Sequence, residues 1–158
     1  MKNKRPAKIR LSHQINNYFC GPAVAVTLLT AYGIRATQKK VARLAHTTKA
    51  AGTSTKGLAS ALRSFGMQVR EDNGRSLRDI HHASREGKTV IVCYTEPREN
   101  SGHYAIVERF RGGKIFLWNP DERGNAPISM SVKEFQGRWK DTLFTHSKRW
   151  AAFVSLYT

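Results

Sequence analysis

The sequence predicts a single α+β domain in two lobes, with helices in its first half and antiparallel strands in its second. Between positions 20 and 87, apolar side chains recur at helical spacing behind capping residues. From position 89 onward they gather into short β-type runs. Consecutive blocks of helices and strands are typical of α+β folds. A chain of 158 residues with 40% hydrophobic side chains is long enough to bury one core, so we expect one domain.

Residues 1–11 form a basic segment ahead of this domain. The segment holds five Lys and Arg side chains and one proline, and it offers little to bury. We therefore expect a flexible arm at 1–11 and the single domain at 12–158.

Four helices are expected before position 88. Cys20-Gly21-Pro22 begins the first, because proline is tolerated in a first helical turn, and Gly33 stands where a glycine would end it. Ser76 and Asp79 form a capping-box pattern at the start of the fourth. The expected spans are 20–32, 37–45, 55–65 and 76–87.

The second half of the chain has the pattern of an antiparallel sheet. Residues 89–94 form a continuous β-type run, as expected for a strand covered on both faces. Gly112-Gly113 separates two further runs and predicts a hairpin. Ser131 and Glu134 form a capping box that predicts a short helix. The expected strands are 89–94, 104–110, 115–118, 127–130 and 151–157.

No segment is predicted to cross a membrane or to direct secretion. The longest apolar run, within residues 23–29, is too short to span a bilayer. The basic residues 1–10 are not followed by the apolar region of a signal peptide. Two cysteines are too few for a disulfide scaffold, so we expect a reducing, cytoplasmic environment.

The charge balance is the unusual bulk property. Lys and Arg number 27 against 11 acidic residues, giving a net charge of +16, and no acid precedes Glu71. Such a field attracts polyanions, so an acidic peptide or protein substrate, or nucleic acid, is a possible partner. No base-stacking or groove-reading motif accompanies the charge, and a solvated basic surface would explain it equally well.

Cys20 is the first candidate for chemistry. A thiol at a helix N-terminus faces unpaired N–H groups and the positive end of the helix dipole, which favour the nucleophilic thiolate. A lone cysteine is more often a small buried side chain, and Cys93, inside the run 89–94, fits that description. Gln14, six residues before Cys20, could donate its amide to an oxyanion, although alone it is more simply a surface residue.

Among the six histidines, His103 stands apart because it begins an expected strand next to the predicted hairpin. If the hairpin loop spans residues 111–113, Asn119 lies opposite Ala105, one diagonal from His103 on the same face. An amide there could orient the imidazole, as in Cys-His-Asn sites. A two-residue loop would send Asn119 to the other face. Asp121 would lie opposite His103 and is the alternative orienting residue.

Neither a metal site nor a cofactor site is predicted. The two cysteines are far apart, and the histidines show no zinc-ligand spacing. No calcium loop and no phosphate loop of the Walker type is present.

Taken together, these blocks resemble the bacteriocin-processing, double-glycine leader peptidases, which are papain-like cysteine peptidases. Gln14, five intervening residues and Cys20-Gly21-Pro22-Ala23 are similar to that family's nucleophile segment. The later blocks follow in the family's order over about residues 12–140. They are Gly52-Thr53-Ser54 with Gly57-Leu58, Val90-Ile91-Val92, Gly102 to Val107, Ile115 to Pro120, and Ser131 to Trp139.

The resemblance implies a papain-like, two-lobed fold and a catalytic set. Cys20 would be the nucleophile, His103 the general base and then acid, Asn119 the orienting residue and Gln14 the oxyanion donor. Asn119 stands where the family usually has Asp, and Phe19 replaces an acid often found before the cysteine. Family members are often the N-terminal domain of an ABC exporter.

The sequence therefore favours a cysteine peptidase that cleaves a peptide or leader-peptide amide bond. One alternative is a non-catalytic papain-like module that binds nucleic acid or an acidic partner through its basic surface. A further alternative is a deamidase or transglutaminase-type enzyme that uses the same Cys-His pair.

Overall fold

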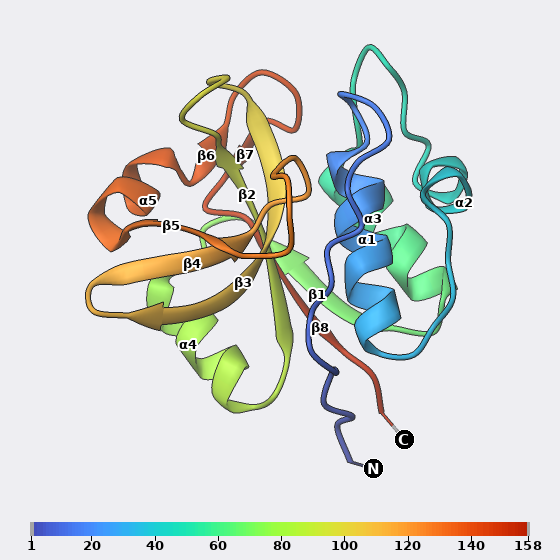
Figure 1. The fold of residues 1–158 in the computed structure, drawn as a ribbon, viewed down its shortest axis with the longest axis horizontal. Coiled ribbons are helices and arrows are strands. Elements are labelled where there is room, and N and C mark those ends of the chain that lie inside the picture. Colours follow the sequence, from blue (N-terminus) through green and yellow to red (C-terminus); the bar gives the residue numbers. More distant parts are fainter. Residues whose placement is uncertain (1, 158) are drawn as a thin grey trace.

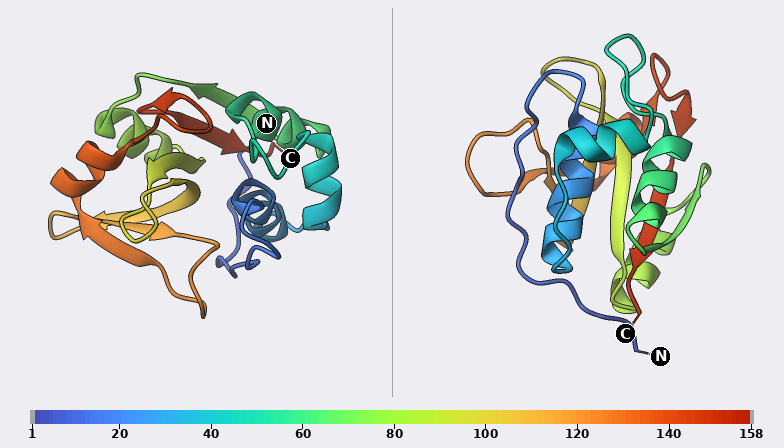
Figure 2. Two further views of the ribbon diagram at one scale, coloured as in Figure 1. Left: turned by 90° about the horizontal axis from the view of Figure 1, so that it is seen from above. Right: turned by 90° about the vertical axis from the view of Figure 1, so that its right-hand side faces the viewer.

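The computed structural model describes residues 2–157, which form a central sheet with helices on both faces (Figures 1 and 2). The helices are α1 (Cys20–Ala31), α2 (Gln38–Leu44), α3 (Thr55–Ser64), α4 (Leu77–Arg85) and α5 (Val132–Arg138). The strands are β1 (Gln68–Asp72), β2 (Thr89–Thr95), β3 (Gly102–Arg111), β4 (Lys114–Trp118), β5 (Ile128–Ser131), β6 (Lys140–Asp141), β7 (Ser147–Lys148) and β8 (Ala151–Ser155). This arrangement confirms the predicted α+β fold class.

Local capping sets where most helices begin. Thr37, Ser54, Ser76 and Ser131 each accept a hydrogen bond from a backbone N–H in the first turn of α2, α3, α4 and α5. The capping box predicted at Ser76 is present in both directions. The helix α1 differs, because its N-cap residue Phe19 makes no such bond. Burial of nearly the whole of α1 stabilises it instead.

The six-stranded sheet has the order β1-β8-β2-β3-β4-β5, and all of its pairs are antiparallel. One face packs against α1, α2 and α3, and the other against α4 and α5 (Figure 1). The residues of β2 alternate between the two cores, which explains its continuous apolar run. The strand β1 was not predicted, because Gln68–Asp72 holds a single apolar residue and pairs only with β8 at the sheet edge.

The N-terminal segment packs along the domain. The backbone N–H of Lys4 donates to the carbonyl of Leu156, and that of Ala7 donates to the carbonyl of Ala31, each at 2.7 Å. Ile9 is buried in the core, and Asn3 forms a bridge with Tyr157. Residues 2–11 therefore contain no helix or longer strand, as expected, but they are held in place rather than forming a free arm. Within residues 2–157, none of the helices has the length and apolar character needed to span a lipid bilayer.

Candidate active site

Cys20 is the first residue of α1, and its half-buried thiol lines a pocket of about 270 Å³ between the helical lobe and the sheet. The start of α1 lies very close to the segment that contains Thr53. A Cβ atom on Gly21 would stand 2.7 Å from the hydroxyl of Thr53, so only glycine fits next to Cys20. The Cys-Gly-Pro sequence thus sets both the beginning of the helix and its distance from the pocket wall.

Burial raises the pKa of the Cys20 thiol above its ordinary value. The backbone N–H groups of Tyr104 and Gly21 act in the opposite direction, and the carboxylate of Asp141 adds to the increase. Desolvation therefore opposes the N–H groups of the helix terminus, and the thiolate character expected of Cys20 stays a prediction. A neutral thiol needs a base to become a nucleophile.

His103, the second residue of β3, supplies an imidazole in the same pocket. Its side chain is only 6% exposed. Within residues 2–157, the ring nitrogen Nδ1 is buried without a hydrogen-bond partner, and Nε2 lies 3.4 Å from Oε2 of Glu99. The next residue, Tyr104, is the one whose N–H acts on the Cys20 sulfur. The helix-start thiol and the strand imidazole therefore face one cavity, as the sequence predicted.

The β3–β4 hairpin has a two-residue loop and also the strand pairing that the sequence analysis expected only for a three-residue loop. The loop has two residues, because Arg111 pairs with Lys114. A bulge then shifts the register at Glu108, so that Ile106 pairs with Trp118. This is the pairing that a three-residue loop would have produced. The bulge therefore returns Asn119 to the face of the sheet that carries His103, which the two-residue loop alone would have reversed.

Asn119 is fully buried just beyond β4, and its amide is held by two other groups. Its Nδ2 donates to the hydroxyl of Tyr94 at 3.0 Å, and its Oδ1 accepts from the backbone N–H of Asp121 at 3.0 Å. Among residues 2–157, no hydrogen bond joins Asn119 to His103, in contrast to the expectation. The carboxylates of Asp121 and Glu99 each place an oxygen within 4.8 Å of an imidazole nitrogen. Two acids therefore approach the imidazole of His103: Asp121, the predicted alternative, and Glu99, which was not predicted.

Gln14 is half-buried in the segment before α1. Its Nε2 donates to the carbonyl of Asn16 at 3.0 Å, and its backbone N–H donates to the carbonyl of Pro120 at 3.1 Å. The side chain does not line the pocket in this conformation. A primary amide has two N–H donors, so one remains free for an oxyanion. Its role as oxyanion donor stays a prediction.

Asp141 is a site residue that the sequence analysis missed. It is 2% exposed in the pocket wall, where it accepts hydrogen bonds from the N–H groups of Leu143, Phe144 and Thr145 and from the Thr145 hydroxyl. These bonds fold the loop after β6 over the cavity. The only local signal is a threonine four residues after the aspartate, a turn pattern that carries no information about catalysis.

The second cysteine lies in the wall of the same pocket. Cys93 is 1% exposed, and its thiol contacts the hydroxyl of Thr145 at 3.7 Å. Burial raises its pKa to about 12. Its core position agrees with the sequence analysis, and an inaccessible, protonated thiol is a poor nucleophile.

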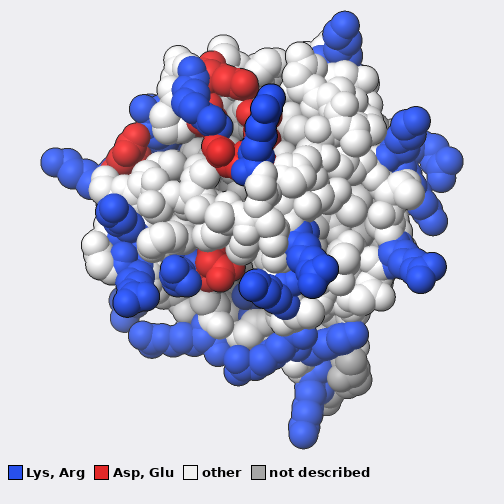
Figure 3. Space-filling view, in the orientation of Figure 1, with Lys and Arg blue, Asp and Glu red and all other residues white. Residues whose placement is uncertain are grey.

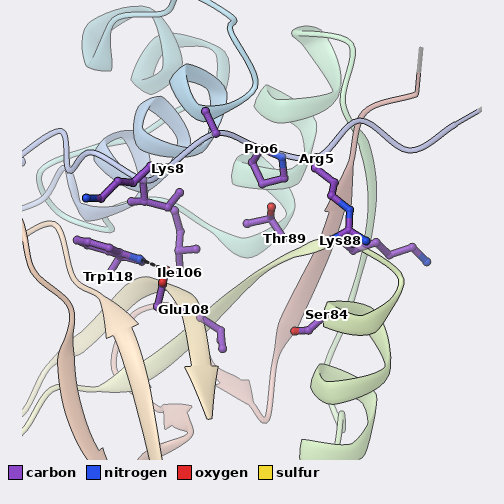
Figure 4. Close-up of a pocket in the computed structure, with 13 residues that line it drawn as sticks. Arg5, Pro6, Lys8, Ser84, Lys88, Thr89, Ile106, Glu108 and Trp118 are labelled. Carbon is purple, nitrogen blue, oxygen red and sulfur yellow. Dashed lines mark hydrogen bonds between the residues drawn. The ribbon is translucent and has the colours of Figure 1, made fainter. Parts of the chain in front are cut away.

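A separate pocket of about 400 Å³ lies where residues 5–9 cross the sheet near the start of β2 (Figure 4). Arg5, Lys8 and Lys88 surround it, and the indole of Trp118 donates to the carboxylate of Glu108 in its wall. Lys and Arg form a band along the lower edge of this face of the molecule (Figure 3). This pocket is lined by neither cysteine nor histidine, so it holds no Cys-His pair.

One group of side chains has the composition of a metal site. Glu99, His103 and Asp121 each place one potential ligand atom within 4.8 Å of the others. They lie on the β2–β3 loop, on β3 and after β4, so no short spacing in the sequence marks them.

Comparisons with known proteins agree with this architecture. The peptidase domain of Streptococcus ComA, described as a bi-functional ABC transporter involved in a quorum sensing pathway, is 22% identical. The match has a TM-score of 0.76 and covers 95% of this chain and 100% of that domain. A double glycine motif protease from an AMS/PCAT transporter, solved in complex with the leader peptide, is 16% identical. Its TM-score is 0.71, with 99% of each chain covered.

A third similar structure is the N-terminal peptidase C39 like domain of the toxin secretion ATP-binding protein from Vibrio parahaemolyticus. It is 10% identical with a TM-score of 0.62, over 91% of this chain and 100% of that domain. At these identities the structures establish the fold. A search of curated proteins gave no match. The sequence itself matches the profile of the Peptidase C39 family over residues 8–150, and the chain therefore belongs to the Peptidase C39 family.

Proposed function

We propose that this protein is a cysteine peptidase in which Cys20 is the nucleophile and His103 is the general base. The observation that carries the proposal is one shared pocket. It is lined by a helix-start thiol and by a buried imidazole whose Nδ1 has no hydrogen-bond partner among residues 2–157. Membership of the Peptidase C39 family supports the same chemistry.

The raised pKa of the thiol favours proton transfer during attack over a preformed ion pair. In this mechanism the imidazole accepts the thiol proton as sulfur bonds to the amide carbonyl carbon. The imidazolium then gives that proton to the departing amine, and water hydrolyses the thioester through the same base. The carboxylates of Glu99 and Asp121 lie where they stabilise the positive imidazolium. The N–H groups at the start of α1, together with Gln14, are the proposed oxyanion donors.

The proposed substrate is a peptide with a double-glycine leader. A structural relative is a double glycine motif protease solved with its leader peptide, and this chain shares its fold. Large apolar side chains are exposed around the cavity and could contact such a peptide. Phe144, 49% exposed, lines the pocket, and Leu143 beside it is 64% exposed.

The test is cleavage of synthetic peptides that carry an internal Gly-Gly pair, followed by mass spectrometry. Cys20→Ala and His103→Ala should each lower turnover by about a thousandfold or more. Gly137→Ala, on the exposed side of α5, is the matched control and should retain full activity. Release of ammonia without chain cleavage would identify a deamidase instead.

The basic band of Figure 3 keeps a binding module as the second candidate. That function predicts steeply salt-dependent binding of nucleic acid or an acidic partner that Cys20→Ala leaves intact. A gel-shift series over salt concentration, run with the wild type and Cys20→Ala, separates the two candidates.

A further inference from the structure

Three elements bring two carboxylates and an imidazole together at the mouth of the candidate active site. Glu99 lies on the loop between β2 and β3, His103 on β3, and Asp121 beyond β4. One ligand atom from each lies within 4.8 Å of the other two, and Nε2 of His103 is 3.4 Å from Oε2 of Glu99. The β3–β4 register, with its bulge at Glu108, is what places Asp121 near His103.

The electrostatics of this cluster differ from those of its neighbours. Arg98 pairs with both Glu96 and Glu122, which satisfies those two acids. In the described part of the chain, Glu99 and Asp121 make no ion pair with any Lys or Arg. Arg98 attracts Asp121 without forming an ion pair with it, and the two carboxylates of the cluster still repel each other. A bound cation would offset that repulsion.

The imidazole between these acids also lacks strong partners. His103 is 5% exposed, and among residues 2–157 its Nδ1 has no hydrogen-bond partner. The 3.4 Å contact of its Nε2 exceeds the ordinary N–H···O range of about 2.7–3.2 Å. A buried imidazole with so little hydrogen bonding can give a ring nitrogen to a metal without losing an existing bond.

We propose that Glu99, His103 and Asp121 form a binding site for a divalent cation of the Zn²⁺ class. One histidine and two carboxylates are a donor set that borderline divalent metals accept, with water in the remaining positions. Metal–ligand distances of about 2.0–2.2 Å require the three ligand atoms to close in by roughly an ångström. The Glu99 side chain, 60% exposed, is free to make this movement.

Metal binding would also regulate the proposed peptidase, a consequence that rests on the proposed function. An imidazole that binds a metal through one nitrogen keeps its proton on the other. Neither nitrogen can then accept the proton of the Cys20 thiol. Zinc should therefore act as a reversible inhibitor, and chelation should restore activity.

The test measures binding directly, in Cys20→Ala protein, so that neither the thiol nor turnover contributes. ZnCl₂ is titrated calorimetrically into this protein and into the same protein with Glu99→Gln or Asp121→Asn. Each substitution should weaken binding at this site by about tenfold or more. Glu122→Gln removes the same charge one residue away and should change the affinity less than twofold. Circular dichroism checks that each variant is folded. Equal affinity in all four proteins overturns the proposal.

A second measurement identifies the ligands in the wild type with CoCl₂. A site built from carboxylates and imidazole gives weak visible bands without a thiolate-to-cobalt charge-transfer band. A strong charge-transfer band would mean that Cys20 holds the metal, and it would overturn the assignment. If zinc binds as described but no peptide is cleaved, the peptidase proposal fails while the metal site stands. If peptides are cleaved and zinc does not inhibit the cleavage, the peptidase proposal stands and the proposed zinc regulation fails.

Discussion

Gly102→Ala tests the close packing that holds His103 in the pocket. A Cβ atom at Gly102 would stand 2.3 Å from Cγ of Asp141 and 2.4 Å from its Oδ2. Asp141 cannot turn away without losing hydrogen bonds, because its carboxylate accepts from three backbone N–H groups and one hydroxyl. The added methyl must therefore displace either the loop after β6 or the start of β3. Overpacking of this kind costs about 2–3 kcal/mol of the free energy of unfolding.

The assay is urea and thermal unfolding followed by circular dichroism. For a domain of this size, the loss corresponds to a melting temperature roughly 4–12 °C lower. Gly137→Ala is the matched glycine, because its Cβ would meet nothing within 4 Å in the helix α5. That substitution should instead raise stability by about 0.5–1 kcal/mol. If Gly102→Ala has the same unfolding midpoints as the wild type, Asp141 does not lie against Gly102 and the described pocket wall is wrong.

Three further predictions concern the thiols and the supporting hydrogen bonds. Burial raises both thiol pKa values, so labelling of Cys20 by iodoacetamide should accelerate as the pH rises above the pKa of an ordinary cysteine. Cys93 should stay unlabelled until the protein unfolds. Labelling of Cys20 that is already maximal in mild acid would indicate a preformed thiolate–imidazolium pair. A raised folded-state pKa also means that Cys93 contributes stability below the unfolded pKa and that this contribution is lost as the pH rises toward about 12, which alkaline urea titrations would detect. Tyr94→Phe leaves the buried amide of Asn119 without its acceptor and should cost about 1–3 kcal/mol in urea unfolding, and an unchanged midpoint would contradict the observed contact. Ser76→Ala removes the cap of α4 and should cost about 1 kcal/mol in the same assay, whereas a neutral result would place the start of this helix elsewhere.

Much of the fold was predictable because its signals are local. The capping residues of α2 to α5, the glycine after α1 and the two-faced burial of β2 each depend on neighbours within a few positions. The edge strand β1 carries no such signal, since its backbone pairing with β8 defines it. Glu99 and Asp141 were missed for the same reason, because an acid outside any local motif gains meaning only from the residues that the fold places beside it.

The sequence by itself determined the order of the elements, the helix-start position of Cys20, the strand position of His103 and membership in a peptidase family. Only the tertiary structure decided that a two-residue loop and a bulge together set the β3–β4 register. It also decided that Tyr94 binds Asn119 and that Asp121 and Glu99 face the imidazole. The physical reason is that capping and periodicity act over a few residues. Side-chain pairing across a sheet depends on the sum of turn length and bulges, and desolvation of Cys20 depends on every segment packed against it.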